Sequence, residues 1–392
     1  MHSLRLKAHE ERRLRAGHLW AYSNEIDTVA TPLKGLKPGA LCRLEDARGK
    51  ALGVGYVHPN VLLSVRLLTG QADALIDREW FERRLRQALS LRERLYPSPH
   101  YRLVFGESDG LPGLVIDRYG DLLSVQLSTA GMEALKEPLV EALQRLLKPK
   151  GILFRNDNAM RQTEGLPLED EVWGEVPEEV ELLESGVRLL APLRAGQKTG
   201  FFYDQHANRD RVLPYVRGAR VLDVFSYVGG WAARAAAAGA ATVACIDSSE
   251  LALDYAARNM AAQGATPETL RGDALDLLKQ LRAEGRQFDV VVVDPPALIK
   301  RKKDEEAGQA HYAALNRAAL HLLAADGILV SCSCSHHLSE EQLQRILLRE
   351  SRQAGRRLQI LERGGQGPDH PVHPAIPETL YLKAFYCRAT VG

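Results

Sequence analysis

The most constraining feature of this sequence is a regular alternation of apolar strands and helices that begins near residue 219. Helical segments separate five short runs: "RVLDVF", "TVACID", "TLRGD", "FDVVVVD" and "GILVSCSC". Strands and helices that alternate in this way form a parallel sheet covered by helices on both faces. The run "YLKAFYCRA" has few charges and no helix after it, so we expect it to join the sheet as a last, antiparallel strand. The predicted fold class is therefore α/β.

The chain before this region has a different pattern and predicts two further domains. Residues 1–73 hold short β-like runs between Pro-Gly and Pro-Asn turns, which is typical of a small β-barrel. Five apolar residues then recur at helical spacing and predict an amphipathic helix: Phe81, Leu85, Ala88, Leu91 and Leu95. An α+β segment and a loose acidic stretch follow it. We place the three domains at 1–73, 74–175 and 176–392.

Charge and cysteine content narrow the class of protein. The 392 residues carry 51 Lys plus Arg against 50 Asp plus Glu, so overall charge gives no sign of nucleic-acid binding. Basic clusters near the N-terminus and in "RKK" at 301–303 are local, and such runs are more often solvated surface. Five scattered cysteines do not make a disulfide framework, and neither an apolar leader nor a long apolar stretch occurs. We therefore expect a cytoplasmic protein without a membrane segment.

The loop after the first strand of the alternating region, "LDVFSYVGGW", indicates which cofactor such a sheet would bind. Ligands lie beyond the carboxyl ends of the strands, and a dinucleotide would need G-x-G-x-x-G there. Phe225 and Tyr227 stand where those glycines would be, so a cofactor without phosphates, such as S-adenosylmethionine, fits better. Acids end three successive strands: Asp223 for the cofactor ammonium group, Asp247 for the ribose hydroxyls and Asp273 for the adenine amino group. The alternative is that these acids cap helices.

Two further segments predict a ligand site. The fourth strand ends in "VVVDPPALIK", where Pro295 and Pro296 form a rigid turn that presents Asp294 and suits the binding of a planar base. A plain end of a strand is the alternative. The stretch "LRAGQKTGFFYDQHANR" at 193–209 has no helical or strand periodicity and no P-loop spacing, and is typical of a loop that covers a ligand.

Cys332 and Cys334 lie two residues apart at the end of the fifth strand, in "LVSCSCSHHLS". The C-x-C spacing suits neither a zinc half-site nor a redox disulfide, so no metal site is predicted. Cys332 is expected to be a small core residue of the strand. Cys334 lies where the strand should open toward the ligand. A thiolate there could add to carbon 6 of a pyrimidine and so make carbon 5 nucleophilic, with Asp294 near the ring nitrogen.

The segments "AGQKTGFFYDQ", "LDVFSYVGG", "VVVDPPALI", "VSCSCS" and "DHPVHPAIPETLYLKAFYC" together resemble the bacterial 23S rRNA 5-methylcytosine methyltransferases of the large-subunit family. The resemblance covers essentially the whole chain. It implies an N-terminal PUA domain, a central α/β domain and a Rossmann-like class I methyltransferase domain with a mostly parallel, seven-stranded sheet. It also implies S-adenosylmethionine as methyl donor, 23S rRNA as partner and Cys334 as nucleophile, although Ser331-Cys332-Ser333 fits the family's S-C-S motif as well.

The resemblance and the strand-end analysis together give one set of expected site residues. Catalysis is assigned to Cys334 and Asp294. Cofactor binding is assigned to Lys198, Thr199, Phe201, Asp223, Phe225, Ser226, Gly229, Asp247, Asp273 and Asp294. RNA binding is assigned to Pro295, Pro296, Arg5, Lys7 and Arg12, since PUA domains bind RNA and basic side chains pair with phosphates.

Two other functions stay open from the sequence. A methyltransferase acting on an exocyclic amine, such as the guanine 2-amino group, also uses an Asp-Pro-Pro-like turn and needs no cysteine. An RNA-binding assembly factor could keep the fold without catalysis. The oligomeric state is open too, with a homodimer as one alternative.

Overall fold

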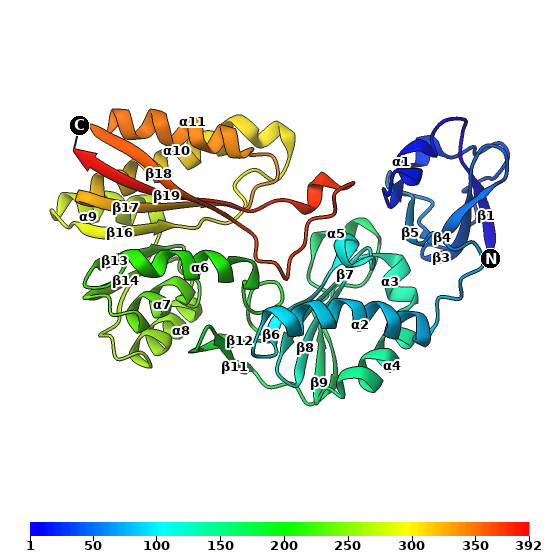
Figure 1. The fold of residues 1–392 in the computed structure, drawn as a ribbon, viewed down its shortest axis with the longest axis horizontal. Coiled ribbons are helices and arrows are strands. Elements are labelled where there is room, and N and C mark those ends of the chain that lie inside the picture. Colours follow the sequence, from blue (N-terminus) through cyan, green and yellow to red (C-terminus); the bar gives the residue numbers. More distant parts are fainter. Residues whose placement is uncertain (392) are drawn as a thin grey trace. The chain divides into compact units, whose positions relative to one another are not determined.

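The computed structural model describes residues 1–391, which form two compact units (Figure 1). The first unit consists of Met1–Glu178, Leu193–Tyr203 and Pro368–Thr379. The second consists of Glu179–Pro192, Asp204–Gly367 and Leu380–Gly392. The domain boundaries at 73 and 175 stay predictions. None of the helices in the described part of the chain is long and apolar enough to cross a membrane.

A small five-stranded sheet begins the first unit, as the β-like runs predict. Its order is β1-β3-β4-β5-β2, made of β1 (His2–Arg5), β2 (Trp20–Ala21), β3 (Ala40–Glu45), β4 (Ala51–Val57) and β5 (Val65–Thr69). One short helix, α1 (Arg12–Arg15), precedes β2. Leu4, Cys42, Val57 and Val65 share one buried core, because alternate residues of each strand face the same side.

A second five-stranded sheet, in the order β10-β9-β8-β7-β6, follows in the first unit. Its strands are β6 (His100–Phe105), β7 (Leu114–Tyr119), β8 (Leu122–Leu127), β9 (Gly151–Phe154) and β10 (Glu171–Gly174). The helices α2 (Arg78–Leu95) and α4 (Lys136–Leu147) contribute side chains to the same core as these strands. The acidic stretch that we expected to be loose contains β10 and also β11 (Glu179–Glu184), which pairs with β12 (Val187–Pro192).

The predicted apolar stripe of α2 is correct only in part. Phe81, Leu85 and Ala88 are buried, whereas Leu91 and Leu95 are 36% and 42% exposed. Arg92 is fully buried instead, and its guanidinium donates to both carboxylate oxygens of Asp109, at 2.6 and 2.8 Å. Helical periodicity could not predict this burial, because the partner carboxylate comes from a distant turn.

The second unit contains a seven-stranded sheet in the order β15-β14-β13-β16-β17-β19-β18. Its strands are β13 (Arg220–Val224), β14 (Thr242–Asp247), β15 (Glu268–Arg271), β16 (Phe288–Val293), β17 (Leu323–Ser333), β18 (Arg356–Gly365) and β19 (Lys383–Val391). The first five run parallel, and β19 is antiparallel to both of its neighbours. The predicted antiparallel last strand is confirmed, but β18, which the sequence analysis did not predict, occupies the edge of the sheet.

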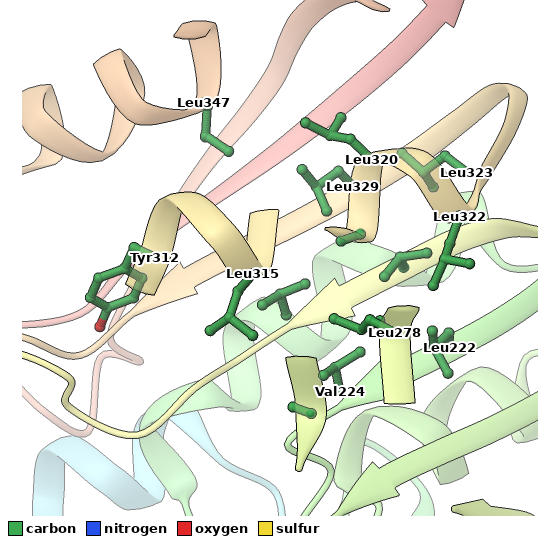
Figure 2. Packing of buried hydrophobic residues seen from close by; sticks show 14 of the residues in the cluster. Leu222, Val224, Leu278, Tyr312, Leu315, Leu320, Leu322, Leu323, Leu329 and Leu347 are labelled. Carbon is green, nitrogen blue, oxygen red and sulfur yellow. The ribbon is translucent and has the colours of Figure 1, made fainter. Parts of the chain in front are cut away.

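Helices cover both faces of this sheet, as the alternation predicts. The helices α9 (Ala274–Ala283), α10 (Glu305–Leu322) and α11 (Glu340–Gln353) pack on one face. Figure 2 shows Leu278, Leu315 and Leu347 of the helices in one buried cluster with Leu222 and Leu329 of the strands. The other face carries α6 (His206–Val212), α7 (Gly230–Ala237) and α8 (Glu250–Ala261). Because the strands are buried on both faces, their carboxyl ends form a rigid edge on which a site can be built.

Candidate active site

The carboxyl ends of β13, β16 and β17 bring the main predicted residues together. Strand order reverses at β13, which lies between β14 and β16. Register pairs Val224 with Val293 and Val293 with Ser331. The next residues along these two strands, Asp294 and Cys332, therefore lie side by side. They stand at the edge of the sheet where ligands bind in folds of this kind.

Asp223 lies in β13, and only one of its two carboxylate oxygens has a hydrogen-bond partner among residues 1–391. Its Oδ2 accepts a hydrogen bond from the Ala232 backbone N–H at 3.2 Å. Its Oδ1 is buried and has no hydrogen-bond partner among residues 1–391. Burial, followed by the charge of Asp294, raises the pKa of Asp223 to about 8. A buried carboxylate oxygen without a partner fits a cationic ligand such as the ammonium group of S-adenosylmethionine.

The loop after β13 uses residues other than glycine where the backbone needs positive φ. Phe225 has φ 65° and Tyr227 has φ 49°, both in the left-handed region that costs energy for such residues. Hydrogen bonds hold this conformation: the backbone N–H groups of Phe225 and Ser226 donate to the Ile246 carbonyl at 2.9 and 3.0 Å. Gly229 (φ 72°) is required for another reason, since a Cβ there would lie 2.9 Å from Cα of Ala256 in α8.

Asp247 and Asp273 differ in what their carboxylates do. Asp247 accepts from the backbone N–H groups of Tyr227 and Ser249, both at 2.9 Å, and so ties the cofactor loop to the end of β14. Asp273 is exposed and caps α9 through hydrogen bonds from the backbone N–H groups of Leu275 and Asp276. Asp273 is thus the N-cap of α9, as in the capping alternative, and Oδ2 of Asp223 likewise accepts from the first turn of α7, whereas its Oδ1 does not cap a helix. Contacts of Asp247 with ribose and of Asp273 with adenine stay predictions.

Asp294 is held by two residues that the sequence analysis did not assign. Its Oδ1 accepts from Nε2 of Gln205 at 2.8 Å, and its Oδ2 accepts from Nε1 of Trp231 at 3.1 Å. Burial raises the pKa of Asp294 to about 6, against the opposite effect of these hydrogen bonds. Both partners stand inside quoted motifs, "FFYDQ" and "VGGW", but only the fold reveals that they meet Asp294.

The two neighbouring cysteines have different surroundings. Cys332 is buried in the core below α6, α7 and α8, and burial raises its thiol pKa well above the ordinary value. Cys334 comes directly after the end of β17, is partly exposed, and its Sγ lies 3.8 Å from the carbonyl oxygen of Pro295. The structure thus brings Cys334 to the Asp-Pro-Pro turn, as predicted, and keeps Cys332 in the core.

A network of buried hydroxyl groups fixes the turn that carries Cys334. Ser333 Oγ donates to the Tyr312 hydroxyl at 2.9 Å, and the Tyr312 hydroxyl lies 3.0 Å from Ser335 Oγ. Ser335 Oγ also accepts from the backbone N–H of Ile299 at 3.1 Å, which joins this turn to the Asp-Pro-Pro loop. No sequence signal identified Tyr312, because it stands inside the apolar pattern of α10.

Other predicted site residues belong to the first unit. Thr199 is buried and its carbonyl accepts from the Tyr119 hydroxyl at 3.1 Å, while the Phe201 ring packs edge-on against Tyr203. Lys198 has φ 50°. Roles of these three residues in cofactor binding stay predictions.

The basic residues proposed for RNA binding lie in the N-terminal sheet module. Lys7 Nζ donates to the Asn24 carbonyl at 2.7 Å. The Arg5 guanidinium nitrogen Nη2 lies 3.9 Å from Oε2 of Glu45, and Arg12 is exposed. Their contacts with RNA, the cytoplasmic location and a homodimer stay predictions. Across residues 1–391, no three His, Cys, Asp or Glu side chains form a group that could hold a metal ion.

Comparisons with known proteins agree with this geometry. Residues 4–70 match the PUA-like domain family, and residues 151–388 match the S-adenosylmethionine-dependent methyltransferases. The chain is 36% identical over 386 residues to the ribosomal RNA large subunit methyltransferase I of Klebsiella pneumoniae, covering 96% of both proteins. Identity to the protein of that name from Serratia proteamaculans is 37%, covering 96% of this chain and 97% of that protein.

Solved structures share the fold. A methyltransferase in complex with SAH superposes with a TM-score of 0.84 at 19% identity, covering 99% of this chain and 100% of that one. A methyltransferase from Streptococcus mutans gives a TM-score of 0.82 at 20% identity, with the same coverage. The predicted PUA-like start and class I methyltransferase fold are confirmed, and S-adenosylmethionine is the cofactor. This chain belongs to the S-adenosylmethionine-dependent methyltransferases and, within them, to the family of the ribosomal RNA large subunit methyltransferases I.

Proposed function

We propose that this protein methylates carbon 5 of a cytosine in 23S ribosomal RNA, with Cys334 as the nucleophile. The observation that carries the proposal is the place of Cys334, partly exposed beyond β17 with its Sγ 3.8 Å from the Pro295 carbonyl. The name of the relatives, ribosomal RNA large subunit methyltransferase I, supports ribosomal RNA as substrate. The PUA-like domain at 4–70 supports RNA binding as well.

In the proposed reaction, the Cys334 thiolate adds to carbon 6 of the cytosine, and a sulfur–carbon bond forms. Carbon 5 then carries the electron pair of the 5,6 double bond and would form a bond to the methyl group, whose bond to the donor sulfur would break. S-adenosylmethionine supplies that methyl group on a positively charged sulfur. Loss of the carbon-5 proton to solvent water then restores the 5,6 double bond and expels the Cys334 thiolate.

Two carboxyl groups of the chain have separate tasks in this proposal. Asp223 would bind the cofactor ammonium group through its Oδ1, which no residue among 1–391 satisfies. Asp294, whose pKa is raised to about 6, would exchange a proton with the ring nitrogen as negative charge moves onto the base. Gln205 and Trp231 keep Asp294 oriented for that exchange.

The product base tests the proposal directly. Unmodified 23S rRNA is incubated with the protein and methyl-labelled S-adenosylmethionine, and the labelled nucleoside is identified by mass spectrometry. We expect 5-methylcytidine, and no transfer by Cys334→Ala. Labelled N2-methylguanosine, or full activity of the Cys334→Ala variant, would refute the proposal in favour of amine methylation. Absence of any transfer by the intact protein would favour a non-catalytic RNA-binding role.

A trapped intermediate tests the choice of cysteine. RNA that contains 5-fluorocytidine cannot lose the substituent at carbon 5, so the enzyme should stay attached to it after methyl transfer. We expect peptide mapping to place the adduct on Cys334. An adduct on Cys332 would contradict the assignment, because that side chain is only 1% exposed in this structure.

A further inference from the structure

Lys383 stands next to the turn that carries Cys334. It is the first residue of β19, where register pairs it with Ser333 of β17 on one side and with Gly365 of β18 on the other. Its Nζ donates a hydrogen bond to the Ser335 carbonyl at 2.6 Å. The amine of Lys383 is therefore held at the backbone of the residue that follows Cys334.

We propose that Lys383 is a positioning residue that keeps Cys334 ionised, through an ammonium–thiolate pair at the adjoining ends of β17 and β19. The Cys334 S–H bond breaks and its proton passes to solvent water, while Lys383 stays an ammonium group that stabilises the thiolate. The inference rests on the proposed role of Cys334 as nucleophile. It goes beyond that role, because it identifies the group that prepares the thiol for attack.

The immediate surroundings of Cys334 would otherwise disfavour a thiolate. The Sγ faces the partial negative charge of the Pro295 carbonyl oxygen at 3.8 Å. Asp294 adds negative charge when it is ionised, and its charge also raises the thiol pKa of the neighbouring Cys332. A nearby cation is the usual way to lower a thiol pKa, and Lys383 supplies that cation.

The charged and titratable groups around the pair come from several elements. Burial lowers the pKa of Lys383 to about 8, while the charges of Cys334 and Glu340 act in the opposite direction. The Glu340 carboxylate of α11 accepts a hydrogen bond from Arg363 of β18 at 2.9 Å. This nearby positive charge weakens the effect of Glu340 on the pKa of Lys383. Around the thiol, the other such groups are Asp294, Cys332 and Tyr312. With a pKa of about 8, Lys383 is mostly an ammonium group at neutral pH and presents its positive charge to the Cys334 thiolate.

Alkylation of the folded protein measures the proposed pair without RNA or cofactor. Cys334 is partly exposed, while Cys42, Cys245, Cys332 and Cys387 are buried. Iodoacetamide should therefore modify Cys334 selectively, and mass spectrometry of its peptide gives the rate at each pH. We expect the intact protein to show a midpoint well below the ordinary thiol pKa of about 8.5.

Three variants separate charge from the hydrogen bond to Ser335. Lys383→Gln keeps a donor for the Ser335 carbonyl but removes the charge, and Lys383→Arg keeps the charge. We expect Lys383→Gln to raise the midpoint by one unit or more, which slows alkylation at pH 7 about tenfold. Lys383→Arg should stay close to the intact protein. The matched control is Lys279→Gln, which removes one charge from an exposed position on α9 and should change nothing.

An unchanged pH profile in Lys383→Gln would overturn the inference. Should that variant fail to fold, the ultraviolet thiolate absorbance of the intact protein minus that of Cys334→Ser gives the midpoint directly, and a value at or above about 8.5 has the same meaning. The proposed function fails separately, if Cys334→Ala still methylates RNA. In methylation assays, Lys383→Gln should lower kcat and shift its pH optimum upward while leaving the affinity for S-adenosylmethionine unchanged.

Discussion

Two turns at the same edge of the sheet are built in different ways. The loop after β13 (225–229) has positive φ at Phe225 and Tyr227 and lies beside a carboxylate oxygen of Asp223 without a partner in the described chain. In the turn at the end of β17 (333–335), both serine hydroxyls form hydrogen bonds with the Tyr312 hydroxyl, and Ser335 Oγ also accepts from the backbone N–H of Ile299. The loop after β13 keeps backbone strain and a buried carboxyl oxygen without a partner in the described chain, which a cationic ligand can bind. The turn at the end of β17 holds a reactive side chain still.

The largest expected effect on the methylation rate is that of removing the Cys334 thiol, which tests the role of the turn at the end of β17. Cys334→Ala should lower the methylation rate by roughly 10³-fold or more, since the nucleophile has no substitute. Affinity for S-adenosylmethionine should not change. Cys332→Ala should keep the rate and lower the free energy of unfolding by about 1 kcal/mol, as a core substitution does. Single-turnover methylation and denaturant unfolding check both, and equal loss of activity in the two variants would contradict the distinction between the cysteines.

The cofactor loop is tested by Asp223→Asn, which keeps an acceptor for Ala232 but removes the charge. A hydrogen bond to a charged group contributes about 1.5–3 kcal/mol, so affinity for S-adenosylmethionine should fall roughly 10- to 100-fold. In the intact protein, affinity should rise as pH increases from 6 to 8, because the ammonium group binds the ionised carboxylate. Calorimetric titration should find no such rise in the variant.

The same substitution should stabilise the cofactor-free protein. The pKa of Asp223 is about 8 in the fold and near 3.9 in the unfolded chain, so between these values only the folded state holds the proton. Stability is therefore lost as pH rises from about 4 to 8. Asp223→Asn should gain about 1–3 kcal/mol at pH 8 and little at pH 4, measured by denaturant unfolding. A destabilised variant at pH 8 would show that the unmet carboxylate is not a cost to the fold.

The turn after β17 is tested by Tyr312→Phe, which removes the hydroxyl shared by Ser333 and Ser335. We expect a loss of about 1–3 kcal/mol of stability, because buried hydroxyls lose a partner. Methylation should slow about tenfold, the factor that corresponds to 1.4 kcal/mol of lost positioning. Tyr215→Phe is the control, since it removes a hydroxyl that binds Glu362 elsewhere in the unit and should keep the methylation rate. Equal rates in both variants would remove the special role of Tyr312.

The smallest expected effect lies outside both turns. Arg12→Ala removes an exposed cation of the PUA-like domain and should weaken RNA binding a few-fold. The loss should be the same for RNAs of different sequence, because a phosphate contact does not read the bases. The slope of log affinity against log salt should fall by about 1 for a lost phosphate contact. Arg345→Ala, an exposed arginine on α11, serves as control in the same filter-binding titration. Identical slopes for all three proteins would remove Arg12 from the RNA interface.

The sequence by itself determined the five parallel strands of the second unit, the helices between them and the row of acids at one edge. Apolar runs and helical spacing follow the chain locally, and the carboxyl ends of parallel strands share an edge whatever their order. Asp223 and Asp294 were therefore placed near a ligand site before any contact was known. The sequence could not order β18 and β19, because strand pairing depends on partners far along the chain.

Only the tertiary structure decided which residues complete the site. Ser331-Cys332-Ser333 and Ser333-Cys334-Ser335 are the same triplet in sequence, yet Cys332 is buried within β17 and Cys334 lies beyond its end. Trp231 reaches Asp294 across 63 residues, and Lys383 reaches Ser335 across 48. Such contacts follow from strand order and register, which fix where distant side chains meet, and no local pattern of residues encodes them.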